Sequence, residues 1–297
     1  PEFTIQEIFE CNLLPHRTKF AINTRAGDLG ITRKDPWTKD EEKELVKVYG
    51  ESSWQDLAQL FPKRTDVALS IRASKLGVER FGSYMYNRHF FSEVTPLTCY
   101  WAGFFAADAC VGDTAVSCEL SVLELNHLIA LRDFTMYTNG KVHYNEERES
   151  VKLAYAGAYH WLDDLRKNFN VTKEKSSVLT PPPFKDLYFI WCYIIGFYDG
   201  DGCVSLTNSK YGQYVSLTIV GVKTMCEWVK SIFDVYFPHT WSRTCAANVV
   251  KAGNIFTYKV SGERAVRIIT FLRDFDVPKL ARKWHRYDNL ITEKYGL

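Results

Sequence analysis

A duplicated apolar segment constrains the fold of this chain more than any other feature. Residues 101–111 read WAGFFAADACV, and residues 194–204 read IIGFYDGDGCV, 93 positions further on. The similarity continues downstream, where LSVLELNHL from Leu120 corresponds to LTIVGVKTM from Leu217. Such a repeat predicts two copies of one structural unit, each of about 95 residues.

Each copy begins with an almost wholly apolar run that we expect to form a helix. The two runs contain Gly103 and Gly196 and end at Asp108 and Asp201. A glycine inside a helix costs about 1 kcal/mol relative to alanine, so its presence in both runs indicates that two backbones approach closely. We therefore expect the two helices to pack together, with Asp108 and Asp201 side by side at their C-terminal ends.

Two adjacent carboxylates at the negative ends of helices repel each other and oppose the helix dipoles. A divalent cation held between them would remove this repulsion. Mg²⁺ and Mn²⁺ prefer carboxylate oxygen ligands. The sequence thus predicts a site for Mg²⁺ (or Mn²⁺) with Asp108 and Asp201 as its ligands.

After the second apolar run, apolar and polar side chains alternate with a period of two, which predicts a half-buried strand pair. Residues 208–212 supply the turn. The first copy alternates in the same way at Ser117, Glu119 and Ser121, but its hairpin is four residues shorter. The polar positions of the second pair are Ser205, Thr207, Ser209, Tyr214, Ser216 and Thr218.

A second, unrelated repeat lies near the N-terminus. Residues 13–31 and 60–78 are identical at nine of nineteen positions, 47 residues apart. The second copy completes three predicted helices, which begin at Trp37-Thr38, at Ser53 and at Asp66. We expect Trp37, Trp54 and Ile71, spaced by 17, to share a core, with Ala68, Ile71 and Leu76 as the inner face of the third helix. The polar side chains left around that helix are Arg64, Thr65, Ser70, Arg72 and Lys75.

Composition excludes several classes of protein. The eight cysteines form no C-x-x-C pair and no cluster with histidine, which excludes a zinc site and favours free thiols in a reducing compartment. No apolar stretch reaches the roughly 18 residues that span a bilayer, so we expect a soluble protein without a membrane partner. Residues 1–3 read as a cloning scar. The net charge is only +2, yet residues 243–297 carry 11 basic and five acidic side chains.

The three N-terminal helices resemble the Myb/SANT-like DNA-binding repeat, in which regularly spaced tryptophans build the core and the third helix enters the major groove. The resemblance implies DNA contacts from Arg64, Thr65, Ser70, Arg72 and Lys75. Ile71 replaces the third tryptophan, and residues 13–31 keep only the last helix and part of the one before it.

The two apolar segments resemble the paired motifs of LAGLIDADG homing endonucleases. The second, IIGFYDGDG, follows the family pattern closely, whereas the first has Ala106 and Ala109 where the family usually has an acidic residue and a glycine. The resemblance implies an α+β fold of two pseudo-symmetric αββαββα halves, whose saddle-shaped antiparallel sheets straddle DNA. The polar strand face of the second half then reads the major groove.

The same resemblance implies metal-dependent hydrolysis of double-stranded DNA at a long asymmetric site by a monomer, with Asp108, Asp201 and Lys259 as catalytic residues. Aligning the two halves puts Ala154 at the position of Lys259, with Lys152 two residues away, so the two active sites are expected to differ. Lys259 can equally be a plain phosphate contact. The implied protein belongs to a mobile element and resides in the cytoplasm or nucleoid of a bacterial or phage-infected cell, or in an organelle.

The expected domains are a partial helix-turn-helix repeat (1–33), a Myb/SANT-like domain (34–82), a linker (83–95) and the two halves (96–182 and 183–297). Two alternatives stay open on the sequence. One is a DNA-binding regulator that kept the fold and lost nuclease activity, which Ala106 favours. The other is an RNA maturase that assists intron splicing, against which the helix-turn-helix region argues.

Overall fold

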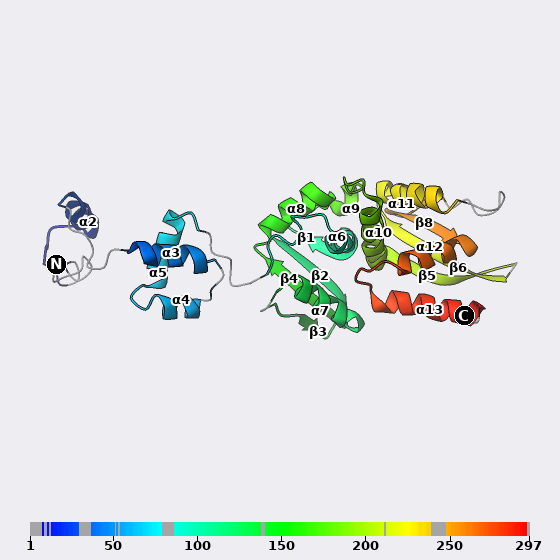
Figure 1. Cartoon of the computed structure of the whole chain (residues 1–297), viewed down its shortest axis with the longest axis horizontal. Coiled ribbons are helices and arrows are strands. Elements are labelled where there is room, and N and C mark those ends of the chain that lie inside the picture. Colours follow the sequence, from blue (N-terminus) through cyan, green and yellow to red (C-terminus); the bar gives the residue numbers. More distant parts are fainter. Residues whose placement is uncertain are drawn as a thin grey trace. The chain divides into compact units, whose positions relative to one another are not determined.

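The computed structural model describes residues 8, 11, 13–29, 37–50, 52, 54–78, 86–137, 140–210, 212–238 and 248–295. The chain divides into two compact units, residues 1–83 and residues 84–297. We describe each unit by itself (Figure 1).

The first unit contains helix α2 (Lys19–Asp28) and a three-helix group of α3 (Lys39–Val48), α4 (Trp54–Leu60) and α5 (Asp66–Lys75). Helix α3 begins with a capping box, in which Thr38 and Glu41 each bond the other's backbone N–H. The Thr65 hydroxyl accepts from the Ala68 N–H at the start of α5. The three predicted helices are confirmed. Their core consists of Leu45, Tyr49, Leu57, Phe61, Leu69 and Ala73.

The predicted core of this unit is wrong at Ile71, which is 55% exposed. Helix α5 buries Leu69 and Ala73, which lie one turn apart on the same face. Ile71 lies two positions from each of them and therefore points away, since two residues turn a helix by about 200°. Trp54 is 39% exposed and packs edge-on against Tyr49.

The second unit consists of two copies of one αββαββα arrangement, so the predicted α+β fold is confirmed. Three further elements lie outside the repeated arrangement. They are a short 3-10 turn (Val122–Glu124) in the first copy, helix α9 (Lys175–Val178) between the copies, and helix α13 (Ala281–Tyr295) after the second copy. The first copy comprises α6 (Pro96–Asp108), β1 (Ala109–Val111), β2 (Ala115–Ser121), α7 (Leu125–Phe134), β3 (His143–Asn145), β4 (Ser150–Ala156) and α8 (Tyr159–Phe169). The second comprises α10 (Leu187–Asp201), β5 (Gly202–Ser209), β6 (Gly212–Gly221), α11 (Lys223–Tyr236), β7 (Val249–Ala252), β8 (Ile255–Ser261) and α12 (Glu263–Arg273).

Each copy forms a four-stranded antiparallel sheet with the same strand order, β1-β2-β4-β3 and β5-β6-β8-β7. One face of each sheet is apolar and buried. In the second sheet, Val204, Leu217 and Val260 lie in one row of that face. The alternation read from the sequence is confirmed by this register.

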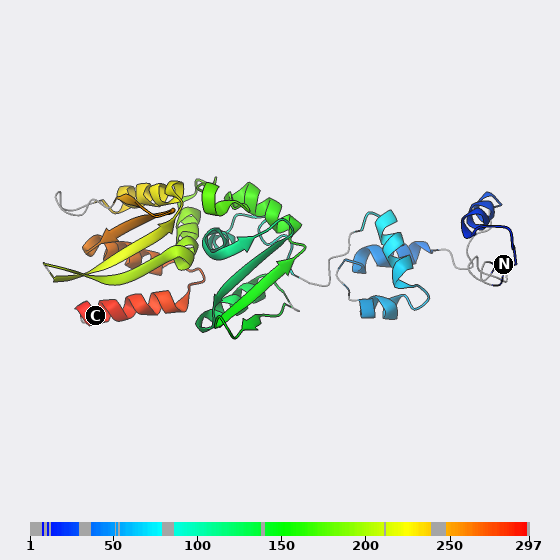
Figure 2. The same ribbon diagram turned by 180° about the vertical axis from the view of Figure 1, so that it is seen from behind.

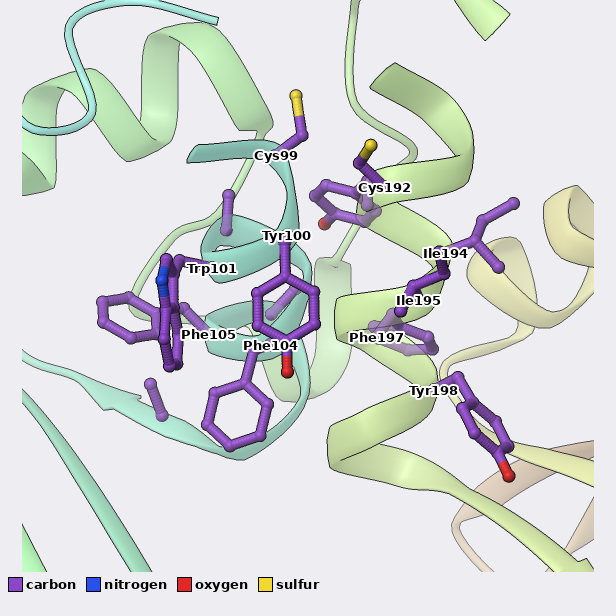
Figure 3. Packing of buried hydrophobic residues seen from close by; sticks show 14 of the residues in the cluster. Cys99, Tyr100, Trp101, Phe104, Phe105, Cys192, Ile194, Ile195, Phe197 and Tyr198 are labelled. Carbon is purple, nitrogen blue, oxygen red and sulfur yellow. The ribbon is translucent and has the colours of Figure 1, made fainter. Parts of the chain in front are cut away.

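Helices α6 and α10 lie side by side between the two sheets in both views (Figures 1 and 2). Added Cβ atoms would collide with the Tyr193 carbonyl at Gly103 and with the Tyr100 carbonyl at Gly196. The two glycines thus let the backbones touch, as the sequence predicts. Aromatic and aliphatic side chains fill the space around this contact (Figure 3).

The described part of the predicted linker, residues 86–95, packs against the first half. Phe90 is 7% exposed and Phe91 is fully buried, and both pack against Trp161 of α8. This segment therefore belongs to the core of the first half. Among the helices that the structure describes, none is long and apolar enough to cross a membrane.

Candidate active site at the ends of the paired helices

Asp108 and Asp201 are the last residues of α6 and α10. We call the contact between α6 and α10 the seam. At its C-terminal end, Gly200 packs against Ala107, and a Cβ on Gly200 would lie 3.4 Å from the backbone nitrogen of Asp108. Asp201 is half-buried, whereas Asp108 is exposed. The structure therefore brings the two predicted carboxylates to the same place.

The surroundings oppose the ionised form of both carboxyl groups. Loss of hydration raises the pKa of Asp201 to about 6, and the nearby charge of Asp108 adds to that rise. Loss of hydration also raises the pKa of Asp108. Positive charges of Lys175 and Lys283 act in the opposite direction on both groups.

Lys175 and Lys283 are functional candidates that the sequence did not reveal. The Lys175 ammonium donates to the carbonyls of Ala106 (3.0 Å) and Ala107 (2.5 Å) at the end of α6. At the end of α10, the Lys283 ammonium donates to the carbonyls of Tyr198 (3.2 Å) and Gly200 (2.6 Å).

The two lysines do not occupy equivalent positions in the repeat. Alignment of the halves puts Lys175 opposite Ala281, and Lys283 opposite Ser177. Lys175 is the first residue of α9, whereas Lys283 lies in the first turn of α13. They reach comparable places from different elements, so the internal repeat gave no signal for the pair.

Asp199, two residues before Asp201, anchors the C-terminal segment to the seam. Its fully buried carboxylate accepts from the Tyr100 hydroxyl (2.7 Å), the Leu280 N–H (2.8 Å) and the Trp284 indole N–H (2.7 Å). Burial raises its pKa to about 6. These bonds tie α6, α10 and the start of α13 together, and they position Lys283. The first half has Ala106 in this place.

The polar face of the second sheet contains most of the predicted contact residues. Cys203, Thr218 and Lys259 form the row two residues past Asp201, and Ser205, Ser216 and Ser261 form the next. The Lys259 ammonium donates to the Thr207 hydroxyl at 3.2 Å. Lys259 thus belongs to the sheet face. The positive charges that lower the pKa of Asp108 and Asp201 are those of the Lys175 and Lys283 ammonium groups.

One predicted contact residue, Ser216, does not reach the surface of this face. Ser216 is fully buried and bonds the hydroxyls of Thr207 (2.9 Å) and Ser261 (2.8 Å), so it supports the surface without reaching out from it. The side chain of Ser209 lies outside the described residues. Tyr214 lies opposite Thr207 and is half-buried.

The first sheet presents a different chemistry on the same face. Its row two residues past Asp108 contains Cys110, Ser117 and Ala154, in the register that Cys203, Thr218 and Lys259 occupy in the second half. The equivalence of Ala154 and Lys259 is therefore confirmed. Lys152 lies opposite Glu119, one row nearer to the end of α6 and Asp108.

In the three-helix group, the two predicted arginine contacts are engaged within the protein. The Arg64 side chain is 11% exposed, bonds Glu41 through Nε (3.0 Å) and Nη2 (2.9 Å), and lies over the Trp37 ring. Arg72 pairs with Glu42. The exposed polar residues from Thr65 to Lys75 are Thr65, which caps the helix, Asp66, Ser70, Ser74 and Lys75.

The carboxylate pair fits Mg²⁺ in one particular way. Among the described residues there is no group of three or more Asp, Glu, His or Cys side chains that could hold a metal. Mg²⁺ is usually bound by one or two carboxylates together with waters and substrate phosphates. Asp108 and Asp201 therefore suit a cation shared with a phosphate, not one enclosed by protein.

Neither a protein-family model nor a curated protein matches the chain. Solved structures do. The LAGLIDADG meganuclease I-AabMI bound to uncleaved DNA is 12% identical, with a TM-score of 0.47 over 67% of this chain and 90% of that one. The I-LtrWI LAGLIDADG homing endonuclease bound to target DNA is 12% identical, with a TM-score of 0.45 over 68% and 91%. I-SmaMI bound to uncleaved DNA in the presence of calcium ions is 14% identical, with a TM-score of 0.43 over 69% and 93%.

Proposed function

We propose that residues 84–297 act as a metal-dependent, site-specific DNA endonuclease of the LAGLIDADG type. The observation that carries this proposal is the pair Asp108 and Asp201, which meet at the ends of two duplicated helices between two polar sheet faces. A paired site of this kind suits the hydrolysis of one phosphodiester bond in each strand of a duplex.

The two sheet faces would bind the duplex on either side of the carboxylates. In the second half, hydroxyl groups and Lys259 offer hydrogen bonds to base edges and phosphates. In the first half, the same face carries Glu119 and Ala154. Because the faces differ, a single chain would read an asymmetric target, whereas a symmetric dimer favours a palindrome.

Asp108 and Asp201 would hold the cations together with the scissile phosphates. A bound cation would act as a Lewis acid toward the phosphate and would lower the pKa of a water molecule bound to it, which favours attack on phosphorus. The chain's own residues orient this centre, since the glycine contacts fix the helix ends and Asp199 fixes α13 against them. Lys259 occurs in one half only, so the two strands are expected to be cut at unequal rates.

The three-helix group would extend the binding site as a Myb-like module. Helix α5 carries an exposed face with Val67, Ser70, Ile71, Ser74 and Lys75. Apolar side chains on such a face can contact thymine methyl groups, and serine or lysine can contact phosphates and bases. Arg64 already pairs with Glu41, so a contact from Arg64 to DNA would require this ion pair to open.

The test is a cleavage assay on DNA that flanks the gene for this chain, backed by a plasmid library of randomised sites. With Mg²⁺ we expect a discrete double-strand break, and with EDTA no product. Sequence-specific binding without a break at any site in the library would contradict the nuclease proposal.

One observation favours a second function, that of a DNA-binding regulator without nuclease activity. Lys175 and Lys283 supply two positive charges beside the two carboxylates, so the site is balanced without a metal. A cleavage assay separates the functions, because a regulator would bind the same target with or without Mg²⁺ and leave it intact.

A further inference from the structure

The two helix ends that would hold a cation already hold ammonium groups. Lys175 donates to the carbonyl of Ala107 at 2.5 Å, and Ala107 directly precedes Asp108. Lys283 donates to the carbonyl of Gly200 at 2.6 Å, and Gly200 directly precedes Asp201. Each ammonium group thus bonds the backbone carbonyl oxygen of the residue that precedes a proposed metal-binding aspartate.

Both lysines are held in place. Lys175 is 9% exposed, and its ammonium also contacts the Ala106 carbonyl at 3.0 Å. Lys283 is half-buried, and its helix is fixed by the bonds of Leu280 and Trp284 to Asp199. In the described part of the chain, no ion pair within 4.0 Å joins either lysine to Asp108 or Asp201. Each ammonium group therefore acts on the carboxylates through space, from the helix-end carbonyl that it bonds.

We propose that Lys175 and Lys283 are internal counter-ions that occupy the cation positions at the ends of α6 and α10 in the DNA-free chain. A divalent cation then binds weakly until a phosphate arrives and the ammonium group leaves the helix end. This inference rests on the proposed function, since it concerns the same carboxylates. It makes Lys175 and Lys283 positioning residues, which act on the cation site through the helix ends.

The experiment measures Mn²⁺ binding to the full chain without DNA, by electron paramagnetic resonance of the free ion. The variants are Lys175→Met, Lys283→Met and the double variant. Lys173→Met is the matched control, because Lys173 pairs with Asp113 at the surface, two residues from Lys175. We expect weak binding by the parent and the control. Each test variant should bind Mn²⁺ at least tenfold more tightly, and Asp201→Asn should abolish the gain in the Lys283→Met background.

If the lysines are only caps of the helix C-termini, the methionine variants will lose stability and gain no affinity for Mn²⁺. That result would overturn the inference, as would a parent that binds Mn²⁺ as tightly as the variants. Lys283→Gln and Lys175→Gln keep a donor for the carbonyls while removing the charge, so they replace any methionine variant that fails to fold. DNA plays no part in this measurement, so failure of the nuclease proposal would show only in the cleavage assay.

Discussion

Replacing Asp201 with asparagine is expected to stabilise the DNA-free protein at pH 8. The protein environment raises the pKa of this carboxyl from 3.8 to about 6. One pKa unit corresponds to about 1.36 kcal/mol. The ionised carboxylate therefore lowers the free energy of unfolding by up to about 3 kcal/mol, and by about 1–3 kcal/mol once its partial exposure is considered. Asparagine keeps the shape of the side chain and removes the charge.

The sign of this effect depends on pH. The folded chain holds the Asp201 proton more tightly than the unfolded chain, so the contribution to stability is greatest below about pH 4 and is lost as pH rises through 6. The advantage of Asp201→Asn should therefore be full at pH 8 and fall below about 1 kcal/mol at pH 4.

Thermal unfolding of the full chain, followed by circular dichroism, measures this difference. We expect Asp201→Asn to raise Tm at pH 8 by about 3–10 °C for a unit of this size. The matched control is Asp163→Asn, whose carboxylate pairs with Arg166 on the surface and should change stability by less than about 0.5 kcal/mol. A lower Tm for Asp201→Asn at pH 8, or an equal gain at both pH values, would show that burial does not raise the pKa of Asp201 in the folded chain.

Three further measurements test other parts of the structure. Gly196→Ala should lower the free energy of unfolding in urea by about 3 kcal/mol or more, because its methyl group would collide with the Tyr100 carbonyl; an unchanged midpoint would contradict the close helix contact. Target DNA should protect the exposed thiols of Cys110 and Cys203 from alkylation more than that of Cys11, whereas equal labelling would argue against binding across the sheets. DNA affinity should fall steeply with salt, by roughly 10³-fold or more between 50 and 200 mM if six or more phosphates are contacted; a flat profile would count against DNA binding.

The duplicated helices and their carboxylates could be predicted because each rests on a local pattern. A glycine inside an apolar helical run indicates that another backbone packs closely against it. The same glycine recurs 93 residues later, which predicts that the two duplicated helices are partners. Period-two alternation fixed which strand residues share a face, and the register bears this out down to the equivalence of Ala154 and Lys259.

The counter-ions could not be predicted in this way. Lys175 and Lys283 lie in α9 and α13, which follow the two αββαββα copies, and extending the alignment of the copies pairs them with Ala281 and Ser177. Their role depends on where α9 and α13 pack, which is a property of the whole unit. The error at Ile71 has a simpler cause, because spacing between tryptophans does not determine the phase of a helix whose inner face is formed by Leu69 and Ala73.

The most direct test of the account is strand cleavage of a supercoiled plasmid that carries the target site. The parent chain, Asp108→Asn and Asp201→Asn would be compared in Mg²⁺ at equal occupancy of the DNA. We predict that the parent linearises the plasmid and that neither variant does, although both still bind it. Linearisation by Asp201→Asn or Asp108→Asn at the rate of the parent would contradict the assignment of the paired helix ends as the nuclease centre.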